Sequence, residues 1–307
     1  MCAAITTTNR VLPVVAIAVA CDAGARDRRC KDGAVAFRQY WARNIGPAHP
    51  QFVWEAAPED FFQDGTTPID IVARTSRWLA GTTRRLTQNH KRFLVIGGDH
   101  SCAIGTWSGA ADALRHSGSL GLIWIDAYLD THRPATMHSG AINSMPVATL
   151  PGYGTPELAS IFRSRGAISP NHICLIGARS FEREEIAFSR RHDVRVIGMD
   201  ELSRRGIEAA CAEARAIAGR CVAGYGVSLD LDAFDPADAP GVGTPEPGAI
   251  RANEFRAAWA DLTCGSLCTG VEIVEYSPYR DRADRTARLI GDLIAATVSE
   301  KRLRWAS

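Results

Sequence analysis

Short runs of apolar, β-branched residues alternate with longer segments of helical periodicity along most of the chain, and this alternation constrains the fold most. The runs are apolar at successive positions, which is typical of strands buried on both faces of a parallel sheet. The expected strands cover residues 11–19, 93–96, 120–125, 172–176, 194–197, 223–231 and 268–274. The expected helices cover residues 34–44, 69–90, 103–116, 182–191, 202–218, 252–261 and 282–302. We therefore predict a three-layer α/β/α sandwich with a mainly parallel sheet.

The charge and composition indicate which kinds of molecule the chain can bind. The 307 residues are 46% hydrophobic and carry 35 Lys and Arg against 34 Asp and Glu, for a net charge of +1. A chain of this size can bury a large core, and its balanced charge offers no basic surface for nucleic acid or for a membrane. Since no repeat or Pro/Gly/Ser-rich linker divides the chain, we predict a single domain over residues 1–307 that binds a small molecule or another protein.

The cysteines and the N-terminal stretch indicate the compartment. Nine cysteines are scattered without a CxxC pair, which is typical of reduced thiols in a cytoplasmic protein. Cys264 and Cys268 lie four residues apart, but no second Cys or His pair completes the four ligands of a zinc site. The apolar stretch 11–21 ends in a cysteine, yet the single Arg10 and the interruption at Pro13 favour a buried strand over a lipoprotein signal. No apolar stretch reaches the roughly 18 residues that a membrane span needs.

Acidic motifs follow three of the expected strands at the point where each strand ends. Because ligands of parallel sheets collect at the carboxyl ends of the strands, these side chains should lie close together, and bare carboxylates would repel one another. Hard divalent cations compensate such clusters, and two neighbouring ions form a hydrolytic site. Each motif alone is more often a turn, but their common placement favours a metal centre. The side chains are His100 in GGDHS, Asp126 and Asp130 in DAYLD, and Asp230 and Asp232 in SLDLDAFDP.

These motifs, in this order, resemble the signature of the ureohydrolase family, which includes arginases, agmatinases and related guanidino hydrolases. The similarity covers nearly the whole chain. It extends from CDAGARDRRCKDGAVAFR at residues 21–38 through the long block SLDLDAFDPADAPGVGTPEPG to VEYSP at residues 274–278. The resemblance implies a three-layer α/β fold, a binuclear manganese or nickel centre that hydrolyses a guanidinium C–N bond, and trimers or hexamers.

The resemblance also implies that one metal site is complete and the other is impaired. The ligands implied for the first site are His100, Asp126, Asp130 and Asp230, and those implied for the second are Asp126, Asp230, Asp232 and a histidine at position 128. The chain has Tyr128 at that position, and a phenol with a pKa of about 10 is a poor ligand because it must first lose its proton. We expect Tyr128 to fill the space and hydrogen-bond to Asp230 or Asp232.

A second departure from the family pattern concerns proton transfer. The family motif SGNxHG, whose histidine carries protons to the leaving amine, corresponds here to SGAINS, with Asn143 in place of the histidine. An amide cannot act as a general acid or base, a role typically worth about 10²–10⁴ in rate. Ser139 remains as a substrate-binding residue, and Glu275 matches the carboxylate that orients the guanidinium, unless it pairs with a local Arg. We expect the nearby His132 and His138 to be surface loop residues.

Three functions therefore stay open. The favoured one is a non-catalytic subunit that assembles with an active ureohydrolase paralogue to cleave a guanidine or biguanide compound, as in heteromeric metformin hydrolase. In that case manganese or nickel would bind at the first site only, or no metal would bind at all. The second is an active guanidino hydrolase with a mononuclear or altered centre. The third is a regulatory protein that senses a small guanidino compound through Glu275.

Overall fold

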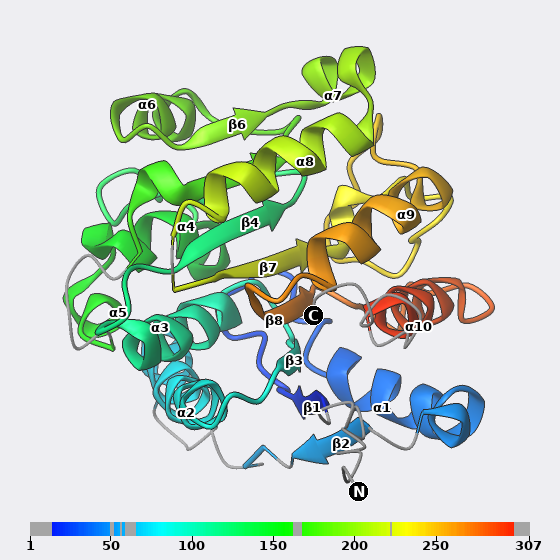
Figure 1. Ribbon diagram of the computed structural model, residues 1–307. Helices are drawn as coiled ribbons and strands as arrows, with labels where there is room; N and C mark the ends of the chain where they lie inside the picture. Colours follow the sequence, from blue (N-terminus) through cyan, green and yellow to red (C-terminus); the bar gives the residue numbers. More distant parts are fainter. Residues whose placement is uncertain are drawn as a thin grey trace, which may run out of the picture.

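A sheet of parallel strands forms the centre of the molecule in the computed structural model (Figure 1), which describes residues 14–49, 52–55, 57–58, 66–161, 168–221 and 223–297. Its eight strands lie in the order β2-β1-β3-β8-β7-β4-β5-β6, and every neighbouring pair is parallel. The strands are β1 (Val14–Ala18), β2 (Phe52–Glu55), β3 (Phe93–Ile96), β4 (Gly121–Ile125), β5 (Ile173–Ile176), β6 (Arg195–Ile197), β7 (Tyr225–Asp230) and β8 (Cys268–Val274).

Both faces of the sheet are buried, which explains why the strands read as continuous apolar runs. Successive side chains of a strand point to opposite faces. Ile123 and Ile125 of β4 therefore join one hydrophobic cluster, whereas Leu122 and Trp124 join the other. The alternation within one apolar run assigns residues to two separate cores, as the sequence pattern predicted.

Helices cover the two faces and complete the three layers (Figure 1). One face carries α1 (Gly33–Asn44), α8 (Ile207–Ala218), α9 (Ala252–Thr263) and α10 (Arg285–Thr297). The other carries α2 (Pro68–Gln88), α3 (Cys102–Leu114) and the short α4 (Pro146–Ala148) and α5 (Pro156–Ala159), while α6 (Arg183–Arg191) and α7 (Met199–Arg205) flank β6 in the chain. The predicted α/β/α sandwich is confirmed, and the sheet is wholly parallel.

Helices α2 and α3 approach each other closely because α3 has glycines at the contact. A Cβ at Gly105 would lie 2.6 Å from the carbonyl oxygen of Ser76, and one at Gly109 would lie 2.1 Å from that of Ala80. Helix α2 itself begins at a capping box in which Thr67 and Asp70 each accept a backbone N–H, with a proline at the first helical position. This pair of helices gives one face of the sheet a closely packed cover.

Within the described residues the structure differs from the predicted elements at strand β2, at the short helices α4 and α5, which were not predicted, and within the predicted helix 202–218. Strand β2 was not predicted, because it has only four residues and lies at the sheet edge, where Val53 is exposed. The predicted helix 202–218 is two helices, since Gly206 has a φ of +81°, which interrupts the helix between α7 and α8. The predicted ends at 11–13 and 298–302 lie outside the described residues.

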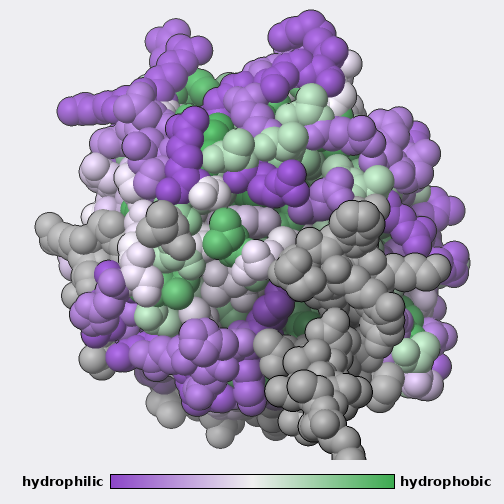
Figure 2. Space-filling view, viewed as in Figure 1, coloured by the Kyte–Doolittle hydropathy of each residue, from purple (hydrophilic) through white to green (hydrophobic). Residues whose placement is uncertain are grey.

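One face of the outer surface is mainly hydrophilic (Figure 2). On the face shown in Figure 2, hydrophilic residues cover the end of the molecule at α6 and α7, and hydrophobic residues appear as scattered spots. No helix of the described residues is long and apolar enough to cross a lipid bilayer. Because all the strands are parallel, their carboxyl ends meet at one edge of the sheet, and the polar motifs follow those ends.

Candidate metal centre

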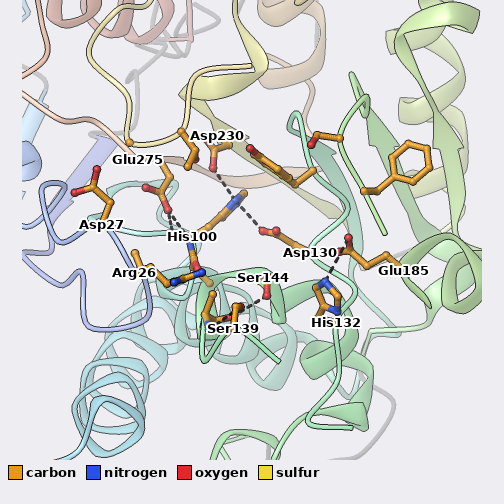
Figure 3. A pocket seen from close by; sticks show the side chains of 18 of the residues that line it. Arg26, Asp27, His100, Asp130, His132, Ser139, Ser144, Glu185, Asp230 and Glu275 are labelled. Atoms are coloured by element: carbon orange, nitrogen blue, oxygen red, sulfur yellow. Dashed lines mark hydrogen bonds and ion pairs between the residues drawn. The ribbon is translucent and has the colours of Figure 1, made fainter. Parts of the chain in front are cut away.

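A cavity of about 580 Å³ opens at the carboxyl ends of the central strands. Its walls come from the loops that follow β1, β3, β4, β5, β7 and β8, so segments far apart in the sequence line one space. Figure 3 shows His100 beside Asp230, with Glu275 on one side of it and Asp130 on the other, and with Glu185 and His132 beyond Asp130. Ser139 and Arg26 form part of the remaining wall.

His100 is fixed in one orientation by the sheet beneath it. Its ring stacks on Trp124 with centroids 4.1 Å apart, and its Nε2 lies 3.0 Å from the hydroxyl of Ser228. Because that hydroxyl donates to Glu272 at 2.8 Å, it accepts a hydrogen bond from Nε2–H. Nδ1 therefore faces the cavity, and in the neutral imidazole it carries the lone pair, as in metal-ligating histidines whose other ring nitrogen is held by a partner.

Three carboxylates converge on that nitrogen. His100 Nδ1 lies 3.0 Å from an oxygen of Asp126, 3.2 Å from one of Asp130 and 3.3 Å from one of Asp230. Despite these short distances, His100 Nδ1 and Asp130 Oδ2 are buried without a hydrogen-bond partner. Buried polar atoms are rarely left unpaired, so an imidazole nitrogen and carboxylate oxygens in this arrangement fit a hard divalent cation.

The electrostatics of the site also favour positive charge. Burial and the charge of Asp126 raise the pKa of Asp230 to about 6 and that of Asp130 well above its usual range. Burial lowers the pKa of His100, but the carboxylates beside it outweigh burial and raise that pKa well above the ordinary value. The cluster thus takes up protons in the absence of another cation, which is the behaviour expected of crowded buried carboxylates.

A second acidic group shares two of these residues. The carboxylates of Asp126, Asp230 and Asp232 could hold a cation, since one oxygen of each lies within 4.8 Å of the others. Burial and the charge of Asp230 raise the pKa of Asp232 well above its usual range. The first group combines His100 with Asp126 and Asp130, whereas the second contains no nitrogen or sulfur ligand among the described residues.

The hydroxyl of Tyr128 does not bind the partner we expected. Its hydroxyl donates to Glu246 Oε1 at 2.9 Å, and not to Asp230 or Asp232. Its backbone N–H donates to Asp126 at 2.8 Å, and the N–H of Ala127 donates to Asp232 at 3.2 Å. The backbone at position 128 therefore lies against the second acidic group while the phenol binds a carboxylate of the 231–249 loop.

Glu275 lies in the cavity beside His100 and has donors on both oxygens. The N–H of His100 and the side-chain amide of Asn143 donate to Oε1 at 3.0 and 3.1 Å, and the thiol of Cys30 donates to Oε2 at 3.1 Å. Its partners among the described residues are these groups and not an Arg. Burial and the charge of Asp230 raise the pKa of Glu275 to about 7.

Two acidic residues of the site have left-handed backbones. Asp130 has a φ of +52° and Glu275 a φ of +65°. Such conformations cost roughly 1–3 kcal/mol each for residues with a side chain and persist where the surroundings impose them. The carbonyl of Asp130 accepts the N–H of Val147, and the N–H of Glu275 donates to the carbonyl of Gly98, so both are held in place. Strain of this kind clusters at functional sites.

The expectation for His132 was wrong. His132 is 8% exposed, and its ring contacts Thr136 at 3.2 Å and Glu185 at 3.5 Å on the cavity wall. Glu185 is also buried, and its carboxylate caps α6 by accepting the N–H of Glu182. A residue that follows a strand-end loop can therefore be buried by the helix that packs on the loop. His138 is exposed, as predicted, and Ser139 is an exposed residue of the cavity rim.

Several residues of the site were not singled out from the sequence. Ser228 and Glu272 orient His100, and Cys30 binds Glu275. Arg179 donates to the carbonyls of Asp232, Glu246 and Pro247, and thereby holds the loop that carries Tyr128's partner. Ser228 precedes the DLD motif by two residues, which was a usable signal, whereas nothing near Cys30 in the sequence indicates its contact with residue 275.

Comparison with known proteins agrees with this geometry. The Arginase family matches residues 12–299. An arginase of Bacillus caldovelox is 37% identical over 233 residues, which cover 76% of this chain and 77% of the relative. An arginase of Bacillus subtilis is 36% identical over 235 residues, with 76% and 78% covered. The crystal structure of the arginase from Bacillus subtilis aligns with a TM-score of 0.83 at 30% identity and covers 94% of this chain and 98% of that one.

Proposed function

Because the chain belongs to the arginase family of hydrolases that act on C–N bonds, we propose that it is a supporting subunit of a hetero-oligomeric guanidino hydrolase and does not turn over substrate by itself. The active partner would be a second arginase-family chain. The substrate would be a guanidine or biguanide compound. The observation that carries the proposal is the direction of Tyr128, whose hydroxyl binds Glu246 and leaves the second acidic group with carboxylates alone.

The two acidic groups differ in a way that matters for a two-ion centre. The first group has the imidazole of His100, which Ser228 and Glu272 orient. The second must rely on oxygens, and the pKa of the Tyr128 phenol is raised by burial and by Glu246, so it stays protonated near neutral pH. Manganese or nickel bound at His100, Asp126, Asp130 and Asp230 would supply Lewis-acid chemistry, which a paired centre would provide more strongly. We therefore expect one equivalent of metal at most.

Proton transfer is the second reason for the proposal. The side-chain amide of Asn143 donates a hydrogen bond to Glu275 Oε1 at 3.1 Å. At this position, a side chain able to exchange a proton would face the bound cation. An amide neither takes nor gives a proton at neutral pH, and loss of a general acid or base typically costs about 10²–10⁴ in rate. His132 does not replace it, because Glu185 and Thr136 bind its ring.

The test compares the purified full chain with the mixed complex. After loading with Mn²⁺ or Ni²⁺, the chain alone should release no urea or amine from arginine, agmatine or a biguanide above background. Co-expression with a second, catalytically intact arginase-family chain from the same genome should give a mixed oligomer that does. Asp130→Asn in this chain should leave the activity of the mixed oligomer intact. Turnover by the chain alone, at the rate usual for the family, would refute the proposal.

One observation favours a second candidate, an active hydrolase with a mononuclear centre. The group of His100, Asp126 and Asp130 is buried and includes an imidazole, and the relatives at 36–37% identity are named arginases. This candidate requires that the purified chain hydrolyse a guanidino compound with one bound ion, and that Asp130→Asn abolish both the activity and the ion. The same substitution therefore separates the two candidates.

A further inference from the structure

The carboxylate of Glu275 is nearly saturated by donors of its own chain. Oε1 accepts two hydrogen bonds, from the N–H of His100 at 3.0 Å and from the side chain of Asn143 at 3.1 Å. Oε2 accepts one, from the thiol of Cys30 at 3.1 Å. A carboxylate has about four acceptor sites, two on each oxygen, so the described residues leave one site without a donor, and it is on Oε2. Glu275 is 5% exposed and Cys30 is fully buried, so these hydrogen bonds are mostly shielded from bulk water.

This saturation discriminates between kinds of cation. A guanidinium binds a carboxylate in a bidentate manner, through two parallel hydrogen bonds that place one N–H on each oxygen. Oε1 has no site for the second N–H as long as Asn143 stays on it, and the backbone N–H of His100 cannot move away. An alkylammonium is a compact charge with rotatable donors, and a single acceptor on Oε2 satisfies it.

Of the three donors to Glu275, Asn143 is the one whose side chain can rotate away from the carboxylate. Its backbone is held on a short turn (Ile142–Ser144), where its N–H donates to Gly24 at 3.2 Å, but its side chain is only partly buried. Rotation of the side chain would free Oε1 without moving the turn. The cost is one hydrogen bond to a charged group, which guanidinium must offset before it can bind in this bidentate manner.

We propose that Asn143 is a specificity-determining residue, which lowers the preference of the cavity for guanidinium over ammonium by occupying Oε1 of Glu275. The inference rests on the proposed function only in taking Glu275 as the group that receives a cation. It concerns binding and is independent of whether the chain turns over substrate.

The experiment measures the affinities of methylguanidine and methylammonium for the full chain by calorimetric or NMR titration. Asn143→Ala should raise the affinity for methylguanidine about tenfold, the size of one hydrogen bond to a charged group, and change that for methylammonium less than about twofold. Cys30→Ala is the matched control, because it removes a donor from the same carboxylate but from the oxygen that already has a free site. It should change both affinities by the same factor.

A second measurement follows the side-chain amide of Asn143 directly. In the unmodified chain, methylguanidine should shift its ¹⁵N–¹H resonances strongly, because the bidentate contact displaces it, and methylammonium should leave them nearly unchanged. The inference fails if Asn143→Ala alters both affinities equally, if Cys30→Ala changes the selectivity as much, or if neither ligand binds any of the three proteins. None of these results bears on turnover, so the proposed function would stand or fall separately.

Discussion

Tyr128→His tests the idea that one side chain separates this chain from a two-ion centre. The backbone at position 128 already donates to Asp126, and its neighbour Ala127 donates to Asp232, so an imidazole there would start beside the second acidic group. We expect the variant to bind a second equivalent of Mn²⁺. The phenol that it replaces contributes only its contact with Glu246 and its packing.

The structure gives the size and sign of the effect. The Tyr128–Glu246 hydrogen bond is 2.9 Å long and partly buried, so its loss should cost about 1.5 kcal/mol, the lower end for bonds to charged groups. An ion that binds only the folded state, at a free concentration of a hundred times its Kd, adds about 2.7 kcal/mol. The variant should therefore be less stable than the parent chain without metal by about 1.5 kcal/mol, and more stable with metal by about 1 kcal/mol.

The assay is equilibrium unfolding in denaturant, with EDTA or with Mn²⁺, together with elemental analysis of the metal per chain. Tyr128→Phe is the matched control, because it loses the same hydrogen bond and gains no ligand. It should be less stable than the parent chain both with EDTA and with Mn²⁺. The reasoning is refuted if the parent chain already holds two equivalents, or if Tyr128→His folds normally and still holds one.

Three further predictions follow from the site and the fold. Asp130→Asn should weaken Mn²⁺ binding, measured by calorimetry, by more than the roughly 10–100-fold that is typical when a residue outside the ligand set is lost. The metal-free protein should keep or gain stability, because the substitution replaces a crowded, buried acid with a neutral amide. Because burial and neighbouring carboxylates raise the pKa of Asp230 to about 6 and of Glu275 to about 7, the metal-free fold binds more protons than the unfolded chain. Its free energy of unfolding should fall by several kcal/mol from pH 4.5 to 7.5, because each tenfold difference in proton affinity between the folded and the unfolded chain is worth about 1.36 kcal/mol. A rise in the free energy of unfolding over that pH range, measured in denaturant titrations, would contradict this. Gly98→Ala should destabilise the fold by about 1–3 kcal/mol or more in the same titrations, since its Cβ would lie 1.9 Å from the carbonyl oxygen of Cys21.

The local sequence pattern was enough to predict the three layers of the fold and the edge of the sheet at which the candidate site lies. A strand buried on both faces must be apolar at every position, and a helix must repeat its apolar positions every three or four residues, so both leave a signal within a few neighbouring residues. The acidic motifs at residues 97–101, 126–130 and 230–232 stand at the carboxyl ends of such strands. Parallel strands bring these motifs to one edge regardless of the loops between them. Elements too short for a period, such as β2, gave no signal.

Tertiary structure alone decided which atoms meet. Tyr128 binds Glu246, which is 118 residues away, and Cys30 binds Glu275 across 245 residues. His132 is buried because α6 packs over its loop. A side chain takes whichever partner the packed neighbours leave within reach of its few rotamers, and those neighbours come from distant segments. The sequence therefore determined which chemical groups gather at the strand ends, and only the folded packing determined which of them are already engaged and which remain free to bind a ligand.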